Sequence, residues 1–189
     1  MKKRVWISFA AALIVFFCGG CEAFQEAIEA GSHSDNPNSD DYQMHFVVGI
    51  FSIVEYPRAS MLEREIRSAD GDVVVINTNQ NFSSKNIRDA RWIARPGNPD
   101  VCDLQFRLDR LGKSLWQMLA GRHHGEQVVL VVDERYVARF VPEFLEDESS
   151  DWVTLRVGID VYTAKGIAKW AKKNYAHLNP NTTSWFDNL

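Results

Sequence analysis

The segment from residue 102 to residue 109 alternates strictly between apolar and polar side chains, and this pattern constrains the fold most strongly. A period of two is that of a β-strand with one face on a core. The apolar face comprises Cys102, Leu104, Phe106 and Leu108, and the polar face comprises Asp103, Gln105, Arg107 and Asp109. We therefore predict a strand here. We also predict that Cys102 is buried and unreactive, since a reactive thiol needs an exposed, electropositive setting.

Further segments have the apolar patterns of strands. The continuous apolar run at residues 128–132 is typical of a central strand that is covered on both faces. An Asp133-Glu134-Arg135 turn then leads into residues 136–141, which predicts a hairpin. Residues 46–54, 73–76 and 153–157 are the other expected strands.

Two helices are predicted after residue 109, and a third before it. In the helix that directly follows residue 109, the apolar spacing gives one inward face, made by Leu111, Leu115, Met118 and Leu119. Gly121 is expected to end this helix. The last helix is expected to be capped by Thr163 and to turn Ile167, Trp170 and Ala171 inward. The third is expected to begin at Ser83 or Ser84 and to carry Ile87, Ala90 and Ile93. Residues 60–68 are expected to form a short helix or an irregular connection.

Strands with helices between them, and a hairpin among the strands, predict an α+β domain. We expect about five strands in a largely antiparallel sheet, with two to three helices packed on one face.

The first 21 residues have the layout of an export signal. Basic residues at positions 2–4 precede an apolar run at 5–17, which is short for a hydrocarbon layer of about 30 Å. The adjoining Cys18-Gly19-Gly20-Cys21 resembles the lipobox of bacterial lipoproteins, although Cys18 stands where that family usually has an aliphatic residue. The resemblance implies that the signal is cleaved before Cys21 and that this cysteine is lipidated. A cleaved secretory signal and an uncleaved anchor are the alternatives. Each predicts that the bulk of the chain lies outside the cytoplasm, and the lipoprotein interpretation predicts that it is anchored to the bacterial cell envelope membrane and faces the periplasm.

Composition limits the partners and the cross-links of the chain beyond the signal. Without the basic residues of positions 2–4, the chain has 18 basic and 25 acidic side chains, a net charge of −7, which disfavours nucleic acid as a partner. Cys102 is the one cysteine beyond position 21, so no intramolecular disulfide is expected. Residues 22–41 are polar and acidic and predict a flexible tether. The expected organisation is a signal peptide at 1–20, a tether at 21–43, a domain at 44–175 and a tail at 176–189.

The chain lacks the sequence motifs of serine hydrolases, nucleotide-binding loops and zinc proteases. His123 and His124 lie beside Glu126 and are weak metal candidates, because further ligands are not near in sequence. Asp103 and Asp109 lie about 20 Å apart in an extended strand, which is too far for a catalytic carboxylate pair. We therefore predict neither catalytic residues nor a metal, a cofactor or a small-molecule substrate.

Four lysines cluster on the polar side of the last predicted helix: Lys165, Lys169, Lys172 and Lys173. They form a candidate membrane-facing basic strip for anionic headgroups. The alternative is an ordinary solvated face, with charges that the helix dipole favours near the C-terminus. The acidic tether argues against purely electrostatic membrane binding.

From about residue 71 to residue 175 the sequence resembles the head subdomain of the first periplasmic domain of SecD and SecDF. The segments that carry the resemblance are 82–90, 104–112 followed by Leu115 and Leu119, 128–133 followed by Tyr136-Val137 and Pro142, Val157-Gly158, and 163–168. The family usually has Asp-Gly at the hairpin turn. Asp133 is followed here by Glu134, which predicts a turn without positive φ at that position. The family's transmembrane helices and its second periplasmic subdomain have no counterpart in the sequence.

The resemblance implies a substrate-handling head without a motor, and it carries over no catalytic residue. We expect a non-catalytic, lipid-anchored envelope protein that binds polypeptide or a partner envelope protein, in connection with protein export. The candidate contact surface is the hairpin at Asp133, Glu134, Arg135 and Tyr136. A constitutive accessory subunit of an envelope complex is the second hypothesis, and an enzyme is the third.

Overall fold

A computed structural model describes residues 36–68, 71, 73–145 and 149–180. The chain divides into two compact units, residues 1–43 and 44–189, and all elements below belong to the second. The predicted signal peptide, Cys21 and most of the predicted tether lie outside the described residues, as does the end of the chain from residue 181.

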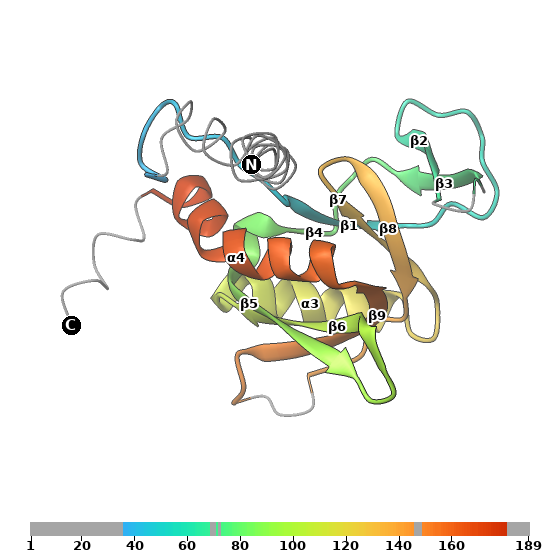
Figure 1. The fold of residues 1–189 in the computed structure, drawn as a ribbon. Coiled ribbons are helices and arrows are strands. Elements are labelled where there is room, and N and C mark those ends of the chain that lie inside the picture. The colour runs from blue at the N-terminus through green and yellow to red at the C-terminus, as the bar shows by residue number, and fades with distance from the viewer. Residues whose placement is uncertain (1–35, 69–70, 72, 146–148, 181–189) are drawn as a thin grey trace, which may run out of the picture. The chain divides into compact units, whose positions relative to one another are not determined.

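The described part of the second unit contains nine strands in three sheets, together with two α-helices (Figure 1). The first sheet has the order β4-β1-β7-β8, and the others have the orders β2-β3 and β5-β6-β9. All of the strand pairings are antiparallel. The strands are β1 (Val48–Ser52), β2 (Glu63–Arg67), β3 (Val73–Asn77), β4 (Phe82–Ser83), β5 (Ile87–Arg95), β6 (Asn98–Leu108), β7 (Val128–Val132), β8 (Arg135–Phe140) and β9 (Trp152–Asp160). The helical elements are a 3-10 turn η1 (Ser84–Asn86), α3 (Arg110–Arg122) and α4 (Val161–Leu178).

The α+β class is confirmed, and the strands are more numerous than expected and divide among three sheets. The predicted strand at 102–109 is the second half of β6, and its apolar face is buried throughout. Cys102 is 0% exposed, which confirms its place in the core.

Helices and sheets enclose one main hydrophobic cluster. Trp116 of α3 is fully buried there, with its ring 5.6 Å from that of Phe82 and stacked 6.2 Å from that of Phe140. Ile167 of α4 belongs to the same cluster. Aromatic pairs of this geometry add to the stabilisation from burial, so β4, β8 and both helices depend on a common core.

The continuous apolar run of β7 is explained by two separate layers. Val128, Leu130 and Val132 face the main cluster. Val129 and Val131 face the opposite way and pack against Ile66, Val74 and Ile76 of the β2–β3 ribbon in a second cluster. Side chains alternate across a strand, so both faces of β7 must be apolar because both are covered.

Two expectations about local structure were wrong. Residues 87–95 form the strand β5 rather than a helix, and residues 63–67 form the strand β2. In β5 the residues Ala90 and Trp92 pair with Phe106 and Leu104 of β6. The spacing of three between Ile87, Ala90 and Ile93 imitates a helical face, but long-range pairing with β6 decides the conformation, and Ile93 is 43% exposed.

The two helices lie where they were expected, with different ends and faces. In α3 the expected Leu119 is buried and the expected Leu115 packs against the core, and Trp116 is fully buried, whereas Leu111 and Met118 are 58% and 59% exposed. Helix α4 is capped by the carboxylate of Asp160 rather than by Thr163. It continues to Leu178, three residues into the expected tail, and its Asn174 is buried.

Candidate functional site: a groove beside the β7–β8 hairpin

The hairpin turn adopts a conformation that the sequence argued against. Asp133 has φ of 47° and Glu134 has φ of 64°, so both central residues are left-handed. Two positive φ values are the mark of a type I′ turn, whose twist matches that of the flanking strands. The expectation that Glu134 would avoid positive φ was therefore wrong, because the strand twist of β7 and β8 outweighs the local preference of a glutamate.

The carboxylate of Asp133 is used inside the domain. It accepts hydrogen bonds from the backbone N–H groups of Phe46 and Val47, at 3.0 and 2.8 Å, while its own N–H donates to the Val47 carbonyl at 3.0 Å. These bonds tie the turn to the chain just before β1. Among the four candidate hairpin residues, Asp133 therefore has a structural role, because its carboxylate oxygens already accept hydrogen bonds from the backbone of Phe46 and Val47.

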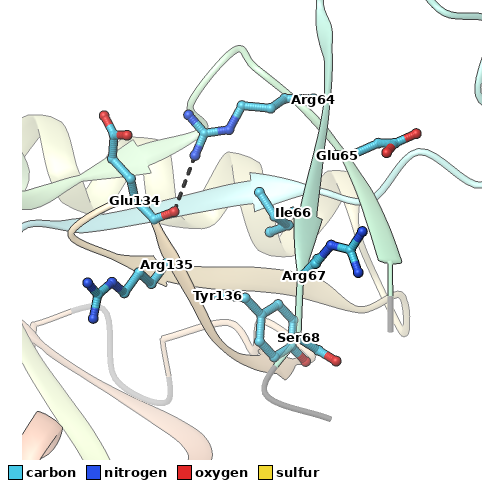
Figure 2. A pocket seen from close by; sticks show the side chains of 8 residues that line it. All are labelled: Arg64, Glu65, Ile66, Arg67, Ser68, Glu134, Arg135 and Tyr136. Carbon is cyan, nitrogen blue, oxygen red and sulfur yellow. Dashed lines mark hydrogen bonds between the residues drawn. The ribbon is translucent and has the colours of Figure 1, made fainter. Parts of the chain in front are cut away.

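The other three hairpin residues line an open groove of about 410 Å³ together with β2. Figure 2 shows Arg64 reaching from β2 across this groove to Glu134, whose carbonyl accepts its guanidinium hydrogen bond at 3.3 Å. Ile66 is buried, and Tyr136 packs against the second hydrophobic cluster. The lining residues are Arg64, Glu65, Ile66, Arg67, Ser68, Glu134, Arg135 and Tyr136. The groove therefore has apolar side chains at its base and charged side chains at its sides.

One edge of β2 has no strand partner in the described structure. Leu62 and Thr78 are joined by a backbone hydrogen bond in register with the β2–β3 ladder, so Arg64 and Ile66 also direct their backbone groups toward β3. Hydrogen-bonding direction alternates along an antiparallel strand. The N–H and C=O groups of Glu65 and Arg67 consequently point outward. Among the described strands β2 pairs with β3 alone, so this edge is open to an added strand.

The sequence pattern does not reveal the β2 half of the groove. Residues 63–67 read Glu-Arg-Glu-Ile-Arg, with one apolar residue in five, so they carry no detectable period of two. Their strand conformation depends on Ile66 entering the second cluster.

The four candidate lysines all lie on α4, whose buried face is turned the other way. Lys165, Lys169 and Lys172 are exposed and Lys173 is half-buried. Lys172 pairs with Asp89 of β5 at 3.4 Å. Lys165 lies over the ring of Trp92, and both Lys169 and Lys173 lie over the ring of Trp170. Trp170, expected inward, is half-buried beside this strip, and its ring packs at a tilt of 48° against that of His45.

His123 takes part in a chain of side-chain hydrogen bonds. Its Nε2 lies 2.9 Å from Ser52 Oγ and its Nδ1 lies 3.0 Å from a carboxylate oxygen of Glu126. Asn81 donates to the same Ser52 oxygen at 2.6 Å. The order hydroxyl, imidazole and carboxylate is that of a serine nucleophile site. Here, however, Ser52 lies in the regular β1–β7 ladder and its oxygen already accepts a hydrogen bond from the Asn81 side-chain amide, which makes it a poor nucleophile. This series of hydrogen bonds links the end of β1 to the end of α3.

Asp103 and Asp109 hold backbone in place. Arg95 binds Asp103 through three hydrogen bonds of 2.7 to 3.1 Å, and Gly158 N–H donates to it at 3.1 Å. Burial by itself would raise the pKa of Asp103, but these hydrogen bonds and the neighbouring Arg156 charge outweigh it and lower the pKa. Asp109 caps α3 by accepting from Gly112 N–H at 2.6 Å.

Within the described ranges, no group of three or more His, Cys, Asp or Glu side chains is placed to hold a metal ion. The described helices also include none with the length and hydropathy to cross a bilayer.

No family model matches the chain, and no curated protein matches it. Its structure is similar to two solved structures of SecDF. The first, described as a membrane component that enhances protein export, has 12% sequence identity and a TM-score of 0.45, over 69% of this chain and 63% of the other. The second, SecDF in a "Super-membrane-facing form", has 13% identity and a TM-score of 0.47, over 68% of this chain and 19% of the other. This chain thus spans less than two thirds of either one. Similarity at this level concerns the partial course of the backbone and transfers no residue's role.

Proposed function

We propose that this protein is a non-catalytic, lipid-anchored protein of the cell envelope whose domain binds extended polypeptide by adding it as a strand to the outer edge of β2. The observation that carries the proposal is the unpaired edge at Glu65 and Arg67 facing the groove beside the hairpin. A bound segment would gain backbone hydrogen bonds from this edge, each worth about 0.5–1.5 kcal/mol.

The side chains of the groove favour a particular kind of segment. Arg64, Arg67 and Arg135 outnumber Glu65 and Glu134, so the lining has a formal charge of +1. An apolar side chain of the ligand would meet Ile66 and Tyr136, and a carboxylate would meet arginine. The charged side chains of β2 also disfavour pairing of β2 with a second copy of itself, since charge on an edge strand discourages self-association.

The proposed location and process rest on the sequence. The signal-like N-terminus ending in Cys21 supports an extracytoplasmic, lipid-anchored protein. The resemblance of residues 71–175 to the SecD head leads us to propose protein export as the process, with emerging chains as clients. A constitutive accessory subunit of an envelope complex is the alternative proposal, and it would use the same groove for one fixed partner.

In-cell photocrosslinking tests the binding site. A photoreactive residue at Glu65 or Arg135 should give adducts, and one at Arg110, which is exposed on α3, should not. A ladder of many weak bands is expected for a client binder, whereas one dominant band would favour the accessory subunit. Adducts at Arg110 with none at Glu65 or Arg135 would overturn the groove as the contact surface.

A proline at position 65 separates strand addition from side-chain contact. Glu65→Pro removes an outward N–H that the β2–β3 ladder does not use, while Glu65→Ala keeps this N–H and removes the same carboxylate. We expect Glu65→Pro to lose the Arg135 adducts and Glu65→Ala to keep them. Equal loss in both variants would show that the carboxylate, not the strand edge, makes the contact.

The enzymatic alternative has its own test. A serine hydrolase would react at Ser52 with a fluorophosphonate, and such an adduct, identified by peptide mass, would contradict the non-catalytic proposal.

A further inference from the structure

The exposed face of α4 has an unusual charge for this chain. Helix α4 contains four lysines and neither aspartate nor glutamate, although acidic residues exceed basic ones in the whole sequence. At about 100° per residue, Tyr162, Lys165, Lys169, Lys172 and Lys173 fall within an arc of about 100° opposite the buried residues Ala164, Ile167, Ala171 and Asn174. We call these five residues the α4 strip.

Aromatic side chains border the α4 strip on both sides. Trp92 of β5 is 40% exposed and lies under Lys165, with the Lys165 Nζ 5.4 Å from its ring centre. Trp170 lies on the other side, under Lys169 and Lys173, at 5.7 and 4.8 Å. Tyr162, at the beginning of the helix, is 77% exposed. The ammonium groups of Lys165, Lys169 and Lys173 therefore lie over rings that are themselves partly open to solvent.

We infer that the α4 strip binds the surface of a bilayer that contains anionic lipid. Lysine, tryptophan and tyrosine together are the side chains of the membrane interface. The ring enters the headgroup level while the ammonium group remains in water beside the phosphates. The strip runs for about 17 Å along the helix, at 1.5 Å per residue, which suits a plane better than a pocket. Lys172 pairs with the carboxylate of Asp89, and Lys165, Lys169 and Lys173 lie over aromatic rings.

This inference does not depend on the groove. The α4 strip would supply an attraction to the anionic surface that the predicted tether lacks, because the tether is acidic and is repelled by such a surface. Each lysine near such a surface strengthens binding roughly fivefold. The three lysines that lie over aromatic rings would then give about a hundredfold, and the effect would weaken as salt shortens the Debye length from about 10 Å at 0.1 M to 3 Å at 1 M.

Brominated lipids test the binding of the α4 strip to the bilayer through Trp92 and Trp170, the two tryptophans that border the strip. The full chain is reconstituted through its own N-terminus into vesicles of phosphatidylcholine, with or without one third phosphatidylglycerol, each prepared with dibromo-acyl lipid. Tryptophan quenching should be several times greater in the anionic vesicles and should fall toward the neutral value in 1 M salt. The double variant Trp92→Phe/Trp170→Phe should lose this increment.

The control variant changes the same amount of charge elsewhere. Lys165→Gln/Lys169→Gln/Lys173→Gln should abolish the difference between the two vesicles. Arg110→Gln/Arg122→Gln/Arg139→Gln removes three exposed positive charges from α3 and β8 and should preserve the difference. Equal quenching in both vesicles, or equal loss in both triple variants, would overturn the proposal. So would displacement of the lipid signal by soluble polyglutamate at a concentration comparable to that of the accessible anionic lipid, which would indicate an acidic protein as the partner.

Discussion

At the scale of single residues, Asp103 stabilises the place where β6 and β9 depart from regular register. The ladder between these strands is interrupted between Cys102 and Leu104. Gly158 lies on β9 within this interruption and has φ of 63°. A Cβ at this position would lie 2.9 Å from the Arg95 guanidinium. A glycine is required at this position for both reasons. Asp103 then satisfies the Gly158 N–H and the Arg95 guanidinium at once.

The lowered pKa of Asp103 predicts a contribution to stability that depends on pH. Because the folded pKa lies below the unfolded value of about 3.9, the contribution is present above that value and is lost as the pH falls through the folded pKa. We expect Asp103→Asn to lower the free energy of unfolding by about 1–2 kcal/mol at pH 7, since a hydrogen-bonded charge is lost. The difference from the original protein should shrink below pH 4. Urea unfolding at several pH values measures this.

Asp100→Asn is the matched control, because Asp100 is exposed on the same strand. A difference for Asp103→Asn that stays constant down to pH 2, or one that Asp100→Asn reproduces, would contradict the assignment.

At the scale of elements, the β7–β8 hairpin shows a tertiary requirement overriding a local preference. Glu134 is held at φ of 64° because β7 is covered on both faces and β8 carries Phe140 into the core. A non-glycine residue in the left-handed region costs about 1–2 kcal/mol.

Replacing Glu134 with glycine should therefore stabilise the protein. The relief of strain exceeds the extra chain entropy that glycine loses on folding, which is about 0.5–1 kcal/mol. We expect Glu134→Gly to raise the free energy of unfolding by about 0.5–1 kcal/mol in urea denaturation. Glu134→Ala keeps the Cβ and should give no such gain. A comparable gain for alanine would mean that the glutamate charge, and not the backbone, is unfavourable.

Several elements were predictable from sequence, and others were not. β6 has a recognisable period of two and β7 is a continuous apolar run, so each could be assigned from its own residues. The prediction for residues 87–95 failed because Ile87, Ala90 and Ile93 also fit a helical spacing. Pairing with β6 makes this segment a strand instead of a helix. In α3 the apolar spacing identified the buried Leu119 and the partly buried Leu115, but not Trp116, which packs between the rings of Phe82 and Phe140 in the core.

At the scale of the whole molecule, the proposed attachment combines a lipid on Cys21 with the α4 strip. The lipid would be the stronger of the two, because the lysines act through screened charge and an acyl chain gains about 0.8 kcal/mol for each buried CH₂. The two attachments should therefore respond differently to salt.

Cys21→Ser should release the protein from membranes in high salt. We expect the variant to remain partly membrane-associated at low ionic strength and to appear in the soluble fraction of lysed cells at 0.5 M salt. Cys18→Ser, three residues earlier, should stay in the membrane fraction at both salt concentrations. Retention of Cys21→Ser at 0.5 M salt would instead indicate an anchor formed by the uncleaved signal.

The sequence by itself determined the α+β class, the buried Cys102, the position of the hairpin and the places of both helices, because each depends on a local period or a local turn signal. Only the tertiary structure decided that residues 63–67 and 87–95 are strands, that β7 is covered by two layers, and that β2 leaves an open edge beside the hairpin. Each of these depends on hydrogen bonds and side-chain contacts between segments that are distant along the chain. A sequence pattern records which residues are apolar, but not which remote partner they meet.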